Sequence, residues 1–144
     1  MTEFRQVTPD FAVCAQPAPA EFARAAAAGF ATIVNNRPDG EDLDQPPDAQ
    51  ARAAAEAVGL DYRALPFQGL PPPSIVAATA TLLEQAKRPI LAYCRSGKRS
   101  IMAWAMAEAL GGARRPDEIV AMAAKAGYDL SGVRGTLDAL APKS

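Results

Sequence analysis

Short apolar runs alternate with longer segments of helical periodicity along most of this chain, and this alternation is what most constrains its fold. The runs at residues 11–15, 30–34, 60–65 and 90–93 are typical of buried strands. Helices are predicted over 19–28, 45–58, 74–86, 101–110, 116–126 and 131–140. Such alternation predicts an α/β fold in three layers: a mostly parallel, four- to five-stranded sheet with helices on both faces.

The bulk properties predict one ordinary globular domain over residues 1–144. The chain is 49% hydrophobic with a formal net charge of −1, so neither nucleic acid nor an anionic membrane is an expected partner. The first residues lack the apolar core of a signal peptide, and two cysteines make no disulfide framework. We therefore expect a cytoplasmic protein. The sequence contains no histidine, which excludes Cys–His dyads, Ser–His–Asp triads and His-based metal sites.

Cys94 ends the strand at 90–93, and the basic loop that follows leads directly into a helix. This arrangement directs backbone N–H groups and a positive helix end at an anion beside the sulfur, and it favours thiolate over thiol. We expect Cys94 to be a nucleophile, although buried cysteines also occur simply as small hydrophobic residues.

The neighbours of Cys94 suit anion binding. Gly97 permits a positive φ and a close backbone approach, and Arg99 can present a planar fork to the oxygens of a bound anion. Ser100 can cap the helix or donate a hydrogen bond to the sulfur. Further substrate contacts are predicted from three residues of the same loop, Arg95, Ser96 and Lys98. For the two cations among them, Arg95 and Lys98, a solvated surface role is the alternative.

A second loop, at residues 35–40, is expected at the same edge of the sheet, because the carboxyl ends of parallel strands gather there. Asn36 and Arg37 are candidates for the pocket wall, with turn hydrogen bonds as the alternative. Asp39 could supply a proton, but Pro38-Asp39-Gly40 is also a good turn. The acidic residues that follow (Glu41, Asp42 and Asp44) suit a helix N-terminus, so neither a metal nor a cofactor is expected. Cys14 fits a structural cysteine better than a resolving thiol.

Three motifs together carry a family resemblance that spans about residues 4–110. Ala15-Gln16-Pro17, the stretch from Asn35 to Glu41 and the loop from Tyr93 to Ser100 resemble the bacterial beta-lactamase-hydrolase-like, phosphatase-like family. The resemblance implies the scaffold of a tyrosine or dual-specificity phosphatase. The Cys-x4-Arg spacing of the loop is similar to that of single-domain rhodaneses, and is one residue shorter than the Cys-x5-Arg loop of the phosphatases.

Two departures from the phosphatase pattern favour sulfur over phosphorus. Tyr93 stands where phosphatases of this type have histidine, and residues 65–69 contain no carboxylate to protonate a leaving alkoxide. The sequence therefore predicts a rhodanese-like sulfurtransferase that moves sulfane sulfur from thiosulfate or a persulfide through a Cys94 persulfide. A sulfide- or persulfide-metabolising enzyme is the partner this implies. The alternatives are a phosphatase acting through a Cys94 phosphoenzyme, with Asp39 as its acid, and a non-catalytic module that binds an anion or a persulfide.

Overall fold

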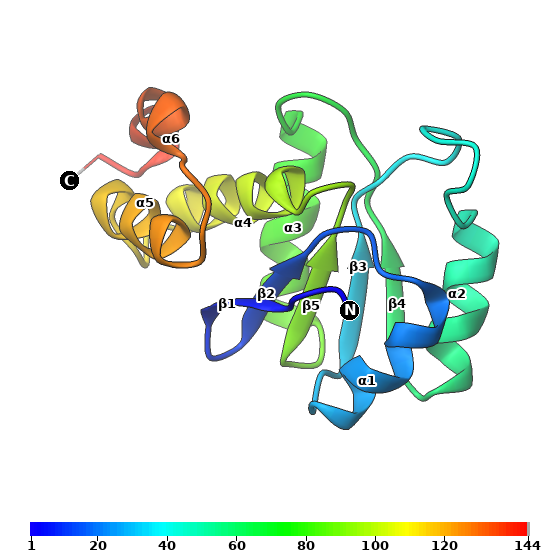
Figure 1. Ribbon diagram of the computed structural model, residues 1–144. Helices are drawn as coiled ribbons and strands as arrows, with labels where there is room; N and C mark the ends of the chain where they lie inside the picture. The colour runs from blue at the N-terminus through cyan, green and yellow to red at the C-terminus, as the bar shows by residue number, and fades with distance from the viewer. Residues whose placement is uncertain (144) are drawn as a thin grey trace.

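Residues 1–143 are described by a computed structural model, which has strands and helices in the alternating order that the sequence predicts (Figure 1). The elements are β1 (Arg5–Thr8), β2 (Phe11–Cys14), η1 (Pro19–Glu21), α1 (Phe22–Ala27), β3 (Thr32–Asn35), α2 (Asp48–Ala57), β4 (Asp61–Ala64), α3 (Pro73–Gln85), β5 (Ile90–Tyr93), α4 (Lys98–Gly111), α5 (Pro116–Lys125), η2 (Ser131–Val133) and α6 (Arg134–Leu140). No helix within residues 1–143 is long and apolar enough to cross a lipid bilayer.

The five strands form one sheet in the order β1-β2-β5-β3-β4. Strand β5 lies between β2 and β3 and is parallel to both, with Cys14 and Asn35 each paired with Tyr93. The ends of β2, β3 and β5 therefore lie side by side, and the chain segments that leave them share one edge of the sheet.

Alternate residues of each strand pack on opposite faces, which gives the sheet two cores. On one face, Val13 and Ala92 pack with residues of α3, α4, α5 and α6. On the other, Cys14 and Tyr93 pack with Phe22 and with alanines of α1 and α2. Figure 1 shows α1 and α2 on the side of the sheet away from α3 and α4, which confirms the expected three layers.

Two elements differ from the sequence prediction. Strand β1, which pairs antiparallel with β2 through a turn at Pro9-Asp10, was not predicted, because this edge strand contains only one apolar residue, Val7. Helix α2 begins at Asp48 rather than at residue 45, because Pro46 and Pro47 provide no backbone N–H and Pro47 is extended (ψ 156°).

Candidate active site

Cys94 directly follows β5 and is only 1% exposed, at the carboxyl edge of the sheet. Its sulfur accepts a hydrogen bond from the backbone N–H of Gly97, with an N···Sγ distance of 3.1 Å. The next residues begin α4, so the helix N-terminus is directed at the sulfur side of the loop. This geometry stabilises negative charge on the sulfur or on an anion bound beside it.

Gly97 is the N-cap of α4, and only a residue without a side chain fits there. Its φ is +93°, and a Cβ would lie 2.2 Å from the hydroxyl oxygen of Tyr128. That hydroxyl donates to the carbonyl oxygen of Ser96 at 3.0 Å. Tyr128, from the segment after α5, therefore closes one side of the loop and fixes its backbone.

Arg99 is held by one edge of its guanidinium. Nη1 and Nη2 each donate to a different carboxylate oxygen of Glu41 at 2.8 Å, and Nη1 also donates to the carbonyl oxygen of Phe67 at 3.0 Å. The hydrogen bonds to Glu41 raise the pKa of Arg99, and the nearby Cys94 sulfur raises it further. Arg99 is thus fixed beside the sulfur as a permanent cation.

The other edge of Arg99 is available to a ligand. Of its five N–H groups, those on Nε and the second on Nη2 have no oxygen or nitrogen acceptor among residues 1–143. These two N–H groups are parallel and form the fork that binds two oxygens of one tetrahedral anion. The site can therefore hold an oxyanion between Arg99 and the loop amides.

Glu41 is the centre of a charged network that the sequence did not reveal. Besides Arg99, it accepts hydrogen bonds from Arg37 Nε at 2.9 Å and from Gln68 Nε2 at 3.0 Å. These hydrogen bonds outweigh partial burial and lower the pKa of Glu41 to about 2, the one from Arg99 having the largest effect. Glu41 is therefore an anchor for Arg99 and is ionised at neutral pH, so it cannot donate a proton there.

The acidic residues after Asn35 do not begin a helix, contrary to the sequence interpretation. Helix α2 starts only at Asp48, and Asp42 instead pairs with Arg37 at 2.7 Å and with Arg95 at 3.7 Å. Asp39 accepts a hydrogen bond from the backbone N–H of Asp48 at 2.8 Å, so it satisfies one of the free N–H groups of α2.

The structure divides the other predicted ligand contacts between buried and exposed positions. Arg37 is 4% exposed and links the loop to Gln16 and to both acids, while Asn36 is buried and donates to the carbonyl of Leu65. Arg95 is exposed, and Lys98 donates to the carbonyl of Asp129. Two serine hydroxyls lie in the same loop. The hydroxyl oxygen of Ser96 accepts a hydrogen bond from the backbone N–H of Lys98, and Ser100 is buried.

Ser100 does not cap α4, since the N-cap is Gly97. Its hydroxyl and that of Tyr93 are the two buried side-chain polar groups without a hydrogen-bond partner among the described residues. An unpartnered hydroxyl one residue after Arg99 can bond to the sulfur or to a bound ligand without breaking another contact. Cys14 is buried, which raises the pKa of its thiol to about 12, as expected for a structural cysteine.

Sequence reasoning missed Glu41 as an anchor, Gln68 as its partner and Tyr128 as a wall of the loop. For Glu41 a local signal exists, because Arg37 stands four residues earlier and pairs with it. Gln68 and Tyr128 reach the site from distant segments, and nothing in their local sequence marks them.

The sheet order, the cysteine loop and the oriented arginine together define an α/β domain with a cysteine and an arginine set for an anion at the carboxyl edge of its sheet. The chain belongs to the beta-lactamase hydrolase-like protein, phosphatase-like domain family, whose model matches residues 3–111. The family expected from the sequence is therefore confirmed.

Similar proteins agree with this assignment. A beta-lactamase hydrolase-like protein of Agrobacterium fabrum is 35% identical over 122 residues, which cover 82% of this chain and 28% of the relative. The chain thus spans little more than a quarter of that protein. A solved structure from Neisseria meningitidis Z2491, described as a candidate phosphatase, is 31% identical with a TM-score of 0.82, covering 94% of this chain and 96% of its own.

More distant structures share the fold. The kinase associated phosphatase has a TM-score of 0.71 at 15% identity, covering 100% of this chain and 97% of its own. TpbA of P. aeruginosa, solved with phosphotyrosine, has a TM-score of 0.63 at 16% identity, with coverages of 94% and 90%. The expected dual-specificity-phosphatase-like fold is confirmed. The relationships support the phosphatase alternative better than the sulfurtransferase that the loop spacing favoured.

Proposed function

We propose that this chain is a cysteine phosphatase that hydrolyses aryl phosphate monoesters through a phosphocysteine at Cys94. The observation that carries the proposal is the free edge of Arg99 beside the sulfur. Its two parallel N–H groups match two phosphoryl oxygens, and the Gly97 N–H and the start of α4 supply further positive potential.

The chemistry proceeds in two displacements. The Cys94 thiolate attacks phosphorus, the bond from phosphorus to the ester oxygen breaks, and the leaving oxygen takes the electron pair. Water then attacks the phosphocysteine, which releases inorganic phosphate and restores the thiolate. Arg99 and the loop amides hold the phosphoryl oxygens through both steps, where negative charge is concentrated.

The state of the nearby carboxylates argues for aryl rather than alkyl esters. Glu41 has a pKa of about 2 and is bound to two arginines, and Asp42 is paired with Arg37 and Arg95. Asp39, the acid expected from the sequence for a phosphatase, caps α2 with one of its oxygens. A phenolate leaves with little protonation, whereas an alkoxide needs an acid worth about 10²–10⁴-fold in rate. Phosphotyrosine is an aryl ester, and TpbA was solved with it.

The test compares p-nitrophenyl phosphate, phenyl phosphate and an alkyl phosphate as substrates. We expect turnover to fall steeply in that order and to vanish in Cys94→Ser, while the matched control Cys14→Ser keeps it. Rapid acid quench followed by mass spectrometry should show one phosphoryl group on Cys94. The absence of turnover with every phosphate ester would refute the proposal. A loss of activity in Asp39→Asn that is larger for phenyl than for p-nitrophenyl phosphate would restore Asp39 as the acid.

A second candidate rests on the loop length. Four residues separate Cys94 from Arg99, which favours a smaller group on the sulfur than a full phosphoryl, and sulfur transfer needs no general acid. Incubation with thiosulfate distinguishes the two. A gain of one sulfur atom on Cys94, absent in Cys94→Ser and accompanied by cyanide-dependent turnover, would favour the sulfurtransferase.

A further inference from the structure

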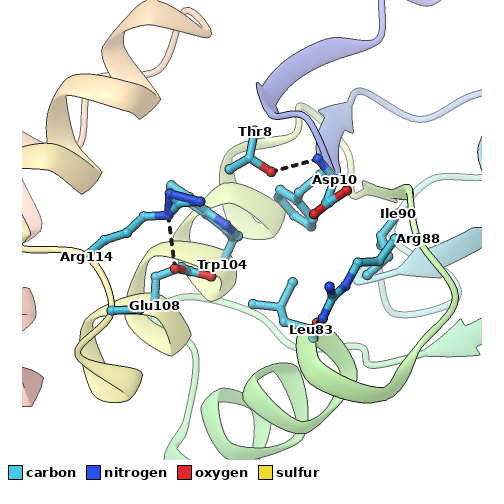
Figure 2. Close-up of a pocket in the computed structure, with 10 residues that line it drawn as sticks. Thr8, Asp10, Leu83, Arg88, Ile90, Trp104, Glu108 and Arg114 are labelled. Carbon is cyan, nitrogen blue, oxygen red and sulfur yellow. Dashed lines mark hydrogen bonds and ion pairs between the residues drawn. The ribbon is translucent and has the colours of Figure 1, made fainter.

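A second pocket lies at the opposite end of the central strand from Cys94. It has a volume of about 400 Å³ and is formed by the β1–β2 turn, the end of α3, the middle of α4 and the α4–α5 connection (Figure 2). Ile90, its residue on β5, is four positions from Cys94, or about 13 Å at the usual rise of a strand. The pocket is therefore separate from the candidate active site.

Trp104 supplies an unused hydrogen-bond donor to this pocket. The residue is 1% exposed and its ring stacks on Phe11, with centroids 5.9 Å apart. Within residues 1–143 no hydrogen bond uses its indole N–H. The indole nitrogen is nevertheless not one of the fully buried polar atoms that lack a partner, which are the hydroxyl oxygens of Tyr93 and Ser100. The small exposed part of Trp104 therefore includes the nitrogen, which opens into the pocket that the residue lines. A donor that the protein leaves unpaired inside a pocket is available to a ligand.

Each side of the pocket carries one arginine and one acid. Arg114 donates through Nε to Glu108 at 3.2 Å, which orients its guanidinium and leaves hydrogens of Nη2 without an acceptor among the described residues. Figure 2 shows Arg114 and Glu108 on one side of the pocket and Asp10 on the other. The Asp10 carboxylate accepts no hydrogen bond and forms no ion pair within residues 1–143, and Arg88, also on that side, is bound to carbonyls at the end of α3.

The composition of the walls selects a ligand class. One side offers two kinds of free N–H donor, from Trp104 and Arg114, and the other side carries the unpaired carboxylate of Asp10. Phe11, Leu83 and Ile90 provide apolar surface beside them. A phosphate or sulfate would meet the unpaired charge of Asp10, and an apolar neutral molecule would leave the donor of Trp104 unsatisfied. A zwitterionic molecule with an apolar side chain matches the N–H donors, the Asp10 carboxylate and the apolar surface together.

We propose that this pocket binds an α-amino acid with an apolar side chain. The carboxylate binds the indole N–H of Trp104 and the free N–H groups of Arg114. The ammonium group binds Asp10, and the side chain packs on Phe11 and Leu83. This inference does not depend on the reaction at Cys94.

The experiment titrates the full chain with L-leucine and follows the fluorescence of Trp104, the one tryptophan of the sequence, with calorimetry in parallel. We expect saturable binding with a Kd of about 0.1–1 mM, the range that a ligand of this size reaches. The single-charge analogues 3-methylbutylamine and 4-methylpentanoate are expected to bind at least about tenfold more weakly, because each leaves one charged partner unmatched.

Variants locate the site. Arg114→Gln and Asp10→Asn are each expected to weaken leucine binding by about tenfold or more, while Arg115→Gln, an exposed arginine that does not line this pocket, leaves it unchanged. Binding of either analogue within threefold of leucine would overturn the assignment of a zwitterionic ligand. No saturable signal up to about 20 mM leucine, or equal loss in Arg115→Gln and Arg114→Gln, would overturn the site itself.

Discussion

Replacing Glu41 with glutamine tests whether the anchor of Arg99, rather than Arg99 alone, produces the oxyanion site. Glu41 accepts four hydrogen bonds, two from Arg99 and one each from Arg37 and Gln68. The glutamine amide keeps one acceptor oxygen but presents an NH₂ group to the guanidinium, so at least two charge-assisted hydrogen bonds are lost. At about 1.5–3 kcal/mol each, less the hydration that the freed groups regain, the stability falls by about 2–4 kcal/mol.

The same change releases the guanidinium of Arg99. Its free edge then samples orientations in which the two N–H groups no longer meet the phosphoryl oxygens together. Removal of one such donor costs about 10²–10³-fold in kcat in other enzymes. We expect Glu41→Gln to lower kcat for p-nitrophenyl phosphate by about 10²-fold, with a smaller change in KM because Arg99 keeps its charge.

Urea unfolding and steady-state kinetics at 25 °C measure the two effects separately. In thermal unfolding, a loss of this size lowers the Tm by about 5–15 °C, at about 2–4 °C per kcal/mol. Asp44→Asn is the control for charge in the same loop, and Ile119→Val, in the core of α5, is the control for destabilisation without a change at the site. Both are expected to keep full kcat. Activity of Glu41→Gln within threefold of the parent would refute the reasoning, as would an equal loss in Ile119→Val.

Three further outcomes follow from the same structure. Gly97→Ala is expected to lose activity and at least about 2 kcal/mol of stability, because the φ of Gly97 is +93° and an added Cβ would overlap the Tyr128 hydroxyl. The matched control, Gly135→Ala, has open space around the new Cβ and is expected to stay close to the parent in urea unfolding. The folded pKa of Glu41 (about 2) lies below its ordinary value of 4.5. The ionised Glu41 carboxylate therefore contributes fully to stability above about pH 4.5, and this contribution is lost as the pH falls towards 2. Urea midpoints measured from pH 7 to pH 3 are expected to fall less in Glu41→Gln than in the parent. Burial raises the pKa of Cys14 to about 12, so iodoacetamide at pH 8 is expected to modify Cys94 alone in the folded chain, and peptide mapping that finds an adduct on Cys14 under these conditions contradicts the structural role.

The local sequence was sufficient for most of the architecture. The periodicities place β3, β4, β5 and the major helices within about three residues of their observed bounds, because buried strands and amphipathic helices each need a regular apolar pattern. The pattern fails at β1, an edge strand whose place depends on the hairpin partner rather than on its own composition.

The Cys94 loop could also be predicted from sequence, because its chemical groups are contained in consecutive residues. Cys94, Gly97 and Arg99 lie within one strand–loop–helix unit, and the backbone geometry of that unit follows from where the strand stops and the helix begins. The family resemblance rests on equally local motifs.

The orientation of Arg99, in contrast, was decided only by the tertiary structure. Glu41 is 58 residues away in the chain, and the crossover connections of the parallel sheet bring the loops after β3 and β5 to one edge. Local sequence cannot report such a contact, because it depends on strand order. The same physical reason hid the role of residues 65–69: they lack an acid in sequence, but in space their Phe67 carbonyl and Gln68 side chain help to hold Arg99 and its partner Glu41.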